Sequence, residues 1–462
     1  MMGAHAQTRR RIEGEIVRRG DPRYDETWAA MLFNHLKPDR FPDVIVRAAS
    51  ERDVPAAVEL ARSQGLRIAV RSGGHSWCGS PLRDRGMLID LSGLRRSDID
   101  AASATATVQP SVTGRDLIAE LAPYGLAFPA GHCGSVALGG YLLSGGLGWN
   151  SPALGPACVS VRQIEAVTAN GEVLTCSTEE NPDLFWAARG AGPGFFAVVT
   201  SFRLGLYPLP AAVATTTYAF PLAELGPVTQ WATEVATGLP ATVELSYVLQ
   251  TASPEMSAAS PRPKVAVVAA TAFADSREEA VRALEPLRTC PLADRALCRQ
   301  LDEPTSFKAL YETSEAMWPA HHRSAVDTLW SDADYGTLLA PLADAIADAP
   351  SDKTLVLAPV TPVSPEKARM HDVAFSVLGS SYVAPFAIWG DPAADDVNVR
   401  WLRDAMHAVE PLGTGHYVAE ADLTADVSRA RRSFAPADWE RLRALKARYD
   451  PENVFHSYLQ PA

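Results

Sequence analysis

The sequence predicts an α+β fold that contains one large sheet. In the first third of the 462-residue chain, short apolar runs alternate with segments of helical periodicity. After Pro208-Leu209-Pro210 the apolar runs become longer, helices lie between them, and glycine-rich loops become rare. An amphipathic helix is predicted near the end of the chain. Strands and helices mixed in this way favour an α+β arrangement.

The elements of the first part follow from apolar periodicity and from the residues that begin and end helices. Ser50 is interpreted as a helix N-cap with Asp53 as its capping-box partner, and Gly65 as the residue that ends this helix. The run 161–176 predicts a hairpin with a type I′ turn at Asn170-Gly171. A further helix is expected over 114–124, and strands over 44–46, 67–70, 87–91, 105–112 and 195–200.

In the second part the predicted elements are longer. The C-terminal helix is expected over 437–449, because Trp439, Leu442, Leu445 and Tyr449 share one face before Asp450-Pro451 ends it. Trp318 and residues 321–323 are interpreted as a solvated loop, and the alternative is that they line the substrate pocket. The other expected elements are strands 243–250, 265–273, 354–360 and 382–389, and helices 277–284 and 397–409.

Composition excludes several classes of protein. The chain is 47% hydrophobic and 21% charged, which is typical of globular proteins. Its net charge is −12, and no basic stripe occurs, so nucleic acid is not an expected partner. No apolar h-region follows Arg9-Arg10-Arg11, and no run approaches the roughly 18 apolar residues of a membrane span. We therefore expect a soluble, cytoplasmic protein whose six cysteines do not form a disulfide framework.

Two glycine-rich loops carry the strongest functional signal. The first spans residues 71–79 and contains His75; the second spans residues 129–149 and contains Cys133. Glycines let backbone N–H groups converge on a phosphate, and each loop also holds a nucleophilic side chain. Neither a Rossmann fingerprint nor a Walker sequence is present. The pattern predicts one cofactor held covalently at two points, in another class of nucleotide-binding fold.

A zinc site is an alternative reading of the same residues. His75, Cys78, His132 and Cys133 could supply four ligands. His132 and Cys133 are adjacent in the chain, which is an awkward geometry for two ligands of one metal ion. A zinc site would also not explain the glycines of the two loops. A single histidine or cysteine is more often a hydrogen-bonded or inert buried residue. Their joint occurrence in two glycine loops favours the cofactor.

The two loops also resemble a known family. Arg-Ser-Gly-Gly-His-Ser at 71–76 resembles the covalent-histidine loop of berberine bridge enzyme-like flavoproteins, in the vanillyl-alcohol oxidase / p-cresol methylhydroxylase superfamily. Gly-His-Cys-Gly-Ser-Val at 131–136 is similar to the covalent-cysteine segment of that family, although Gly134 stands where proline is usual. The resemblance continues over 181–190, 196–200 and 449–455, and it is weak between residues 208 and 415.

The resemblance implies FAD joined through its 8α-methyl to His75 and through ring carbon six to Cys133. It also implies a split architecture, in which an FAD-binding domain of the p-cresol methylhydroxylase type (1–207 and 416–462) surrounds a substrate-binding domain (208–415) with a large antiparallel sheet and helices. Asn453 is expected near the flavin and Val199 near the adenine. The remaining expected cofactor contacts are Arg71, Ser72, Gly73, Gly74, Ser76, Gly134, Ser135, Val136, Gly139, Gly140 and Gly146.

The implied activity is that of an oxidase with bicovalently attached flavin. It would oxidise an alcohol, sugar or natural product by hydride transfer to flavin and reduce dioxygen to hydrogen peroxide, and Val136 resembles the residue of the oxidases. The candidate bases are Tyr417 and Glu420, at a segment that departs from the family's Tyr-x-Asn pattern. On the strand predicted there, they would point to opposite faces. A dehydrogenase and a catalytically silent flavin-binding protein remain alternatives; the oligomeric state is not predicted.

Overall fold

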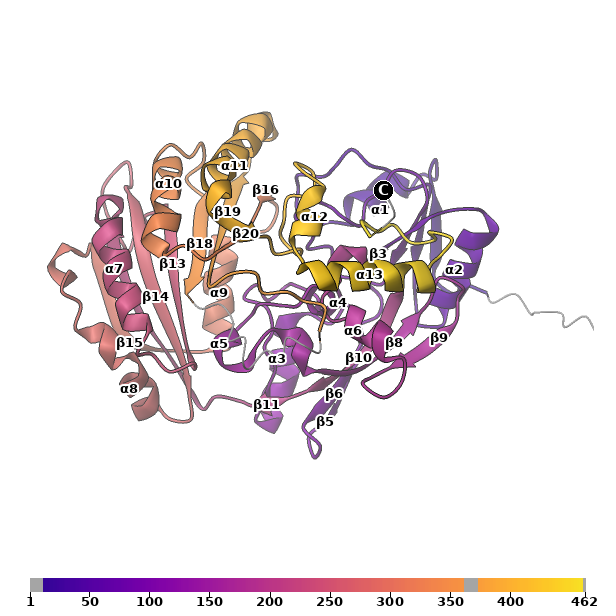
Figure 1. Ribbon diagram of the computed structural model, residues 1–462, viewed down its shortest axis with the longest axis horizontal. Helices are drawn as coiled ribbons and strands as arrows, with labels where there is room; N and C mark the ends of the chain where they lie inside the picture. The colour runs from indigo at the N-terminus through magenta and orange to yellow at the C-terminus, as the bar shows by residue number, and fades with distance from the viewer. Residues whose placement is uncertain (1–10, 361–372, 460–462) are drawn as a thin grey trace, which may run out of the picture.

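The computed structural model describes residues 11–360 and 373–459, and it confirms the α+β prediction. Figure 1 shows a large sheet with helices on its outer face, beside a second part that contains the smaller sheets. The described strands form sheets of four, five, two and nine strands. In the described ranges, no helix combines the length and the apolar character that crossing a membrane requires.

The first sheet has the order β1-β2-β4-β3, in which β2, β4 and β3 are parallel. Three of its strands, β2, β3 and β4, confirm predicted strands. Their apolar residues are buried in one cluster with α2, which is why an apolar run in the sequence indicates them. The strands are β1 (Glu15–Arg18), β2 (Val44–Arg47), β3 (Ile68–Arg71) and β4 (Met87–Asp90), and the helix is α2 (Asp53–Ser63).

The predicted start of α2 was wrong. The helix begins at Asp53 with Arg52 as its N-cap, and the Ser50 side chain makes no capping bond. Instead, the Asp53 carboxylate accepts hydrogen bonds from the backbone N–H groups of Glu13, Gly14 and Ala49 at 2.7–3.0 Å. Asp53 therefore joins the helix start to the strand β1 segment, a long-range contact that local sequence does not reveal.

The second sheet is antiparallel, with the order β5-β6-β10-β8-β9. The hairpin formed by β8 and β9 confirms the predicted one, but the turn is not type I′. Gly171 has a φ of 78°, whereas Asn170 does not have the positive φ that this type also requires. The strands are β5 (Ser97–Asp100), β6 (Thr105–Val108), β8 (Val161–Val167), β9 (Val173–Cys176) and β10 (Val198–Gly205); β7 (Leu126–Ala127) pairs separately with β11 (Tyr207–Pro208).

The nine-stranded sheet has the order β15-β12-β14-β13-β18-β19-β17-β20, and β16 also pairs with β19. The sheet has two different faces because side chains alternate along each strand. Tyr218, Tyr247 and Val268 pack into the core with the helices, while Val248 and Val267 belong to a separate cluster on the opposite face. Its strands are β12 (Ala212–Pro221), β13 (Val243–Thr251), β14 (Lys264–Ala274), β15 (Cys298–Thr305), β16 (Arg323–Val326), β17 (Leu329–Ser331), β18 (Leu355–Val360), β19 (Ser381–Trp389) and β20 (Gly413–Gly415).

Four helices cover the outer face of this sheet, as Figure 1 shows. They are α7 (Leu225–Ala236), α8 (Arg277–Arg288), α10 (Tyr335–Ala347) and α11 (Asp395–Val409). The inner face is directed toward α5, which contacts β13. The remaining helices are α1 (Tyr24–Ala29), α3 (Gly114–Leu121), α4 (Leu138–Leu143), α5 (Ser151–Leu154), α6 (Pro182–Ala187), α9 (Phe307–Met317), α12 (Ser428–Arg432) and α13 (Pro436–Tyr449).

The C-terminal tail returns to the first part of the chain. Trp439, Leu442 and Leu445 on α13 are buried in the same hydrophobic cluster as residues of α6 and β10. Beyond the helix, Phe455 forms a parallel bridge with Ile68 of β3. The predicted face of the last helix is thus the face that packs.

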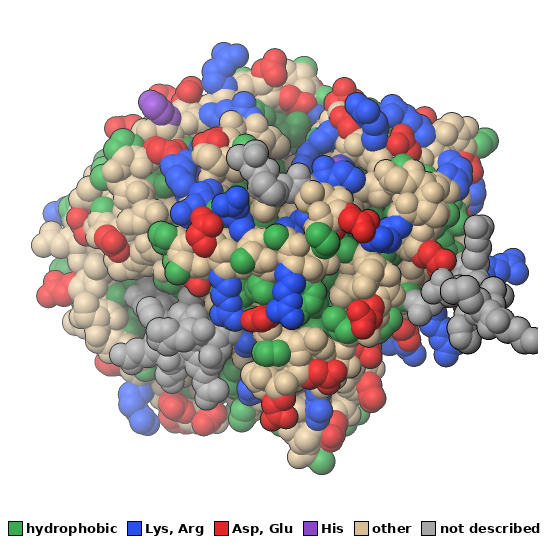
Figure 2. Space-filling model, turned by 45° about the vertical axis from the view of Figure 1, so that its right-hand side comes forward, with side chains coloured by type: hydrophobic (Ala, Val, Ile, Leu, Met, Phe, Trp, Pro, Cys, Tyr) green, Lys and Arg blue, Asp and Glu red, His purple; other side chains and the backbone are tan. Residues whose placement is uncertain are grey.

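The molecular surface carries charges of both signs. Figure 2 shows acidic and basic side chains interspersed on the face that it displays. The excess of acidic residues behind the net charge of −12 is not gathered there into one patch.

Candidate active site

A cavity of about 1130 Å³ lies between the two glycine loops and the inner face of the nine-stranded sheet. This volume exceeds the roughly 300–1,000 Å³ of common small-molecule sites. Residues of both glycine loops line it, as do alternate residues of β12, β13, β14, β18 and β19. The cavity is therefore large enough to hold more than one small molecule.

The first glycine loop follows β3 and is fixed by Arg71. The Arg71 guanidinium donates to Asp90 at 2.8 Å and to the carbonyl of Met31 at 3.1 Å. Gly74 has a φ of +75°, and a Cβ there would lie 2.4 Å from the same Met31 carbonyl oxygen. Only glycine fits this close approach of two backbone segments.

The second glycine loop packs directly on the first. A Cβ on Gly73 would lie 2.6 Å from the Cβ of Ala137, and one on Gly139 would lie 2.8 Å from Oγ of Ser72. Gly140 behaves differently, because a Cβ there would have nothing within 4 Å. Gly140 thus presents bare backbone to open space in the cavity, which is the arrangement expected of a cradle for a ligand.

His75 and Cys133 meet at one hydroxyl. Oγ of Ser135 lies 3.0 Å from Nε2 of His75 and 3.4 Å from Sγ of Cys133. The ring of Phe33 stacks on the imidazole with a centroid distance of 4.3 Å. Burial, together with the charge of Arg71, lowers the pKa of His75 to about 4, so its imidazole is neutral and keeps a lone pair at neutral pH.

The segment that carries Tyr417 and Glu420 is a turn, so the predicted strand was wrong. Strand β20 ends at Gly415, and the backbone N–H of Glu420 donates to the carbonyl of Tyr417 at 3.0 Å. A turn brings residues three apart to the same side, whereas a strand separates them. Both side chains consequently line the cavity, and the expectation that only one could face it is corrected.

The two candidate bases have different surroundings. The Tyr417 hydroxyl accepts a hydrogen bond from the backbone N–H of Gly146 at 3.2 Å, and burial next to Glu420 raises its pKa well above the usual value. Glu420 accepts a hydrogen bond from the Tyr382 hydroxyl at 3.1 Å. Burial also raises the pKa of Glu420, against the opposing effect of hydrogen bonds from Tyr382 and Trp77. A carboxylate with a raised pKa is a stronger base than an ordinary carboxylate, while this tyrosine stays protonated.

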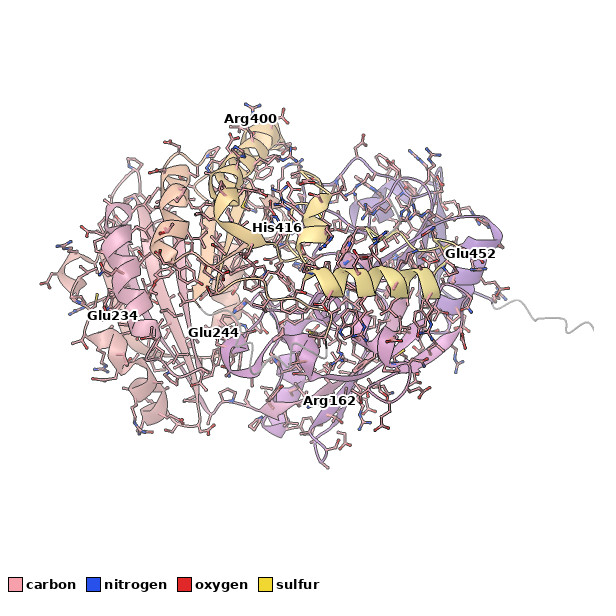
Figure 3. All side chains as sticks on the ribbon, viewed as in Figure 1. Arg162, Glu234, Glu244, Arg400, His416 and Glu452 are labelled. Atoms are coloured by element: carbon pink, nitrogen blue, oxygen red, sulfur yellow. The ribbon has the colours of Figure 1, made fainter. Side chains whose placement is uncertain are left out.

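A buried polar cluster holds this turn in place. Oγ1 of Thr328 accepts the backbone N–H of Tyr417 at 2.9 Å, and Oδ1 of Asp327 accepts that of Asp422 at 3.0 Å. Arg429 pairs with Asp327 at 2.8 Å, and burial nevertheless raises the pKa of Asp327 to about 6. His416, at the centre of Figure 3, lies 2.6 Å through Nδ1 from the carbonyl oxygen of Thr328. These bonds fix both ends of the turn that presents Glu420.

Most of the predicted cofactor residues line this one cavity. They are Arg71, Ser72, Gly73, Gly74, His75, Ser76, Cys133, Val136, Gly139, Gly140 and Val199. Gly134, Ser135, Gly146 and Asn453 do not line it. Asn453 instead accepts a hydrogen bond from the Lys446 ammonium at 2.7 Å and borders a smaller, separate cavity.

Several lining residues were missed from the sequence. Phe455 and His456 of the tail reach the cavity. Trp318 lines it too, which was the alternative to its interpretation as part of a solvated loop. Glu244 on β13 also lines it, where the sheet faces α5 (Figure 3). Alternation along β13 could have indicated that Glu244 and Ser246 share a face, but the occupant of that face depends on the fold.

The four residues of the alternative zinc site do not gather into one cluster. Sγ of Cys78 is 3.2 Å from Oγ of Ser80, and Nε2 of His132 is 3.4 Å from Oε2 of Glu244. Within residues 11–360 and 373–459, no group of three or more histidine, cysteine or acidic side chains is placed to hold a metal ion.

Comparison with known proteins agrees with this arrangement. Residues 42–177 match the family model of an FAD binding domain, and residues 416–459 match that of berberine and berberine-like proteins. The FAD-linked oxidoreductase janO of Penicillium janthinellum is 32% identical over 432 residues, which cover 92% of this chain and 93% of the relative.

Two solved structures share the fold over almost their whole length. The 6-hydroxy-D-nicotine oxidase of Arthrobacter nicotinovorans has a TM-score of 0.83 and 24% identity, covering 98% of this chain and 99% of its own. The xylooligosaccharide oxidase of Myceliophthora thermophila, bound to xylobiose, has a TM-score of 0.81 and 21% identity, with 98% of both chains covered. The chain therefore belongs to the berberine bridge enzyme-like family of FAD-linked oxidoreductases, and its cofactor is FAD.

Proposed function

We propose that this protein is an oxidase that carries FAD bound covalently to His75 and Cys133 and that oxidises a hydroxylated small molecule with dioxygen as the electron acceptor. The observation that carries the proposal is the meeting of the two side chains at Ser135, within 3.0 and 3.4 Å of its hydroxyl. They come from separate loops, 58 residues apart in the sequence, and both line the same cavity. Two attachment points for one ring require this convergence.

The residues around the cavity suit FAD. Gly140 exposes bare backbone to the cavity, where an extended anionic ligand has room, and Arg83 supplies positive charge to the lining. Arg71 also lines the cavity, but its charge is paired with Asp90. The neutral imidazole of His75 has the lone pair that bond formation needs. Bound FAD would supply the hydride acceptor at this site.

Glu420 is the proposed base. A carboxylate can accept the proton of a substrate hydroxyl as the neighbouring carbon is oxidised, and the raised pKa of Glu420 increases its basicity. Tyr382, which donates to Oε2, would hold the carboxylate in one orientation. Tyr417 stays protonated, and its hydroxyl would hold the backbone of Gly146 beside the turn.

Single substitutions at the two attachment residues test the covalent links separately. We expect His75→Ala to retain FAD through Cys133 alone and Cys133→Ser to retain it through His75 alone, because each bond forms at a different atom. Flavin fluorescence after denaturing electrophoresis and peptide mapping would show the surviving link. Cys78→Ser is the matched control and should keep both links, since Cys78 lies in the first loop but contacts Ser80. Complete release of FAD from either single variant would contradict dual attachment.

Dioxygen as acceptor is supported by the oxidases among the similar structures and by Val136, whose modest side chain lines the cavity. We expect the reduced protein to regain its yellow absorbance rapidly when it is mixed with aerated buffer in a stopped-flow instrument, with one hydrogen peroxide formed per flavin. Slow reoxidation in air, with rapid reoxidation by an artificial quinone, would assign a dehydrogenase instead.

A further inference from the structure

The inner face of the nine-stranded sheet forms one wall of the cavity, and strand pairing divides its side chains into two halves. On the polar half, Thr271 pairs with both Thr215 and Glu244, and Thr217 pairs with Gln300. Ser246 joins the same row as Thr217 through Ala269. We call these six residues the polar half: Thr215, Thr217, Glu244, Ser246, Thr271 and Gln300.

Further along the same strands, the wall becomes apolar. Val248 pairs with Val267 and Leu357, and Leu357 pairs with Ala384. One row beyond, Leu355 pairs with Phe386. We call these six residues the apolar half: Val248, Val267, Leu355, Leu357, Ala384 and Phe386. Neighbouring strands lie about 4.8 Å apart, so each half extends across several strands.

The polar half carries hydrogen-bonding groups that the protein does not use. Five of its six side chains, all except Glu244, have no hydrogen-bond partner among the described residues, and all six line the cavity. Thr271 is buried, Thr215, Thr217 and Ser246 are partly exposed, and Gln300 is exposed, so these polar groups are open to a ligand in the cavity. A row of free hydroxyl and amide groups facing a cavity indicates a ligand with several hydroxyl groups.

The apolar half is extended by aromatic rings. Phe386 contacts Trp318 with a centroid distance of 5.4 Å and Trp77 with a distance of 5.8 Å. Both tryptophans line the cavity. Such rings bind flat apolar groups, so this end suits the hydrocarbon or aromatic body of a ligand.

The position of Glu420 relates the two halves to the proposed chemistry. The hydroxyl of Tyr382 donates to Glu420, and Tyr382 lies on β19. Along this strand the order is Tyr382, Ala384 and Phe386, so Tyr382 lies at the end of the apolar half that adjoins the polar half. A substrate hydroxyl that reaches Glu420 thus lies beside the polar half, and the rest of the molecule extends over the apolar half. Glu244, whose carboxylate lies 3.4 Å from Nε2 of His132, would repel an anionic group at this end.

Building on the proposed function, we propose that the substrate is an uncharged, hydroxylated molecule with an apolar or aromatic body, which lies along the strands with its hydroxyl groups on the polar half. Neutral hydroxyl and amide groups recognise hydroxyls without requiring a charge. The wall contacts the hydroxylated end and the apolar end of the same molecule. A molecule that has only one of these two ends should therefore bind more weakly.

Three probes that share one ring system test this orientation. They are 2-naphthyl β-D-glucoside, which has both ends; 2-naphthol, which lacks the polyol; and 2-naphthyl β-D-glucuronide, which adds a carboxylate. Their dissociation constants can be measured on the holoenzyme, without oxygen, from changes in the visible flavin spectrum. We expect the glucoside to bind about tenfold more tightly than either of the other two.

Two matched variants locate the contacts. Thr217→Val combined with Ser246→Ala removes two hydroxyls at nearly constant shape, and we expect it to weaken glucoside binding about tenfold while leaving 2-naphthol binding unchanged. Val248→Thr makes the reverse change on the apolar half and should weaken the binding of both. Gln300→Leu reports on the same row if the double variant does not fold.

The proposal is overturned if the glucoside does not perturb the wild-type flavin, if the glucuronide binds as tightly as the glucoside, or if the polar-half variants bind the glucoside like the wild type. These outcomes leave the proposed function untouched as long as the flavin stays attached to the protein. A preparation without attached flavin would contradict the proposed function instead.

Discussion

Replacing Glu420 by Gln should lower the rate of flavin reduction by about 100- to 10,000-fold, the usual contribution of a general base. The amide has nearly the same shape and can still accept the hydrogen bond from Tyr382, but it cannot take up a proton. Attached FAD and the visible spectrum should be retained. The rate is measured by anaerobic stopped-flow mixing with a compound, from a panel of alcohols, sugars and natural products, that reduces the wild type.

The pH profile distinguishes a base from a structural residue. Because burial raises the pKa of Glu420, the wild-type rate should fall as the pH decreases through that raised pKa and the carboxylate becomes protonated. In Glu420→Gln this limb should be absent. Tyr417→Phe should cost about tenfold or less, since its hydroxyl is a hydrogen-bond acceptor for Gly146. A larger loss in Tyr417→Phe or in Glu244→Gln than in Glu420→Gln would move the base to that residue.

Replacing Gly190 by Ala should destabilise the protein by about 4 kcal/mol. A Cβ at Gly190 would lie 1.9 Å from the backbone nitrogen of Phe375, and the φ of +147° is one that side chains disfavour. Overpacking costs about 1–3 kcal/mol and such a backbone conformation about 1–3 kcal/mol more. The backbone carbonyl of the neighbouring Arg189 accepts a hydrogen bond from the N–H of Phe375 at 3.1 Å. The two backbone segments therefore cannot move apart without breaking this bond. The free energy of unfolding is measured by urea denaturation.

A second glycine serves as the control for this substitution. Gly226 lies in α7, and a Cβ there would have nothing within 4 Å. Gly226→Ala should therefore increase stability by about 0.5–1 kcal/mol, because alanine favours helix. If Gly190→Ala were as stable as the wild type, the close contact between residues 190 and 375 would be wrong.

The fold could be predicted where local sequence determines it. Val44, Ile89 and Val267 lie in runs of apolar residues whose strands are buried, so pattern alone indicates them. The start of α2 could not be predicted, because the Asp53 carboxylate accepts hydrogen bonds from the backbone of Glu13 and Gly14, about forty residues away in the chain. The turn at Tyr417 was missed for the same reason, since Thr328 and Asp327 hold it from a distant segment.

The site divides in the same way. His75 and Cys133 stand out in the sequence because glycine loops surround them. Glu244 and Tyr382 carry no such signal: they are ordinary strand residues, and only the pairing of β13, β14, β18 and β19 places them on the wall of the cavity. The cofactor attachment residues can therefore be predicted from a local loop motif. The residues of the substrate wall cannot, because they depend on the register of the sheet.

The central claim concerns two bonds, and intact mass spectrometry of the purified protein followed by peptide mapping tests it most directly. The predicted result is a chain heavier by one FAD, less the hydrogens lost when both bonds form, with one flavin joining the peptide that contains His75 to the peptide that contains Cys133. A chain at its unmodified mass, with free imidazole and thiol in those two peptides, would contradict the account.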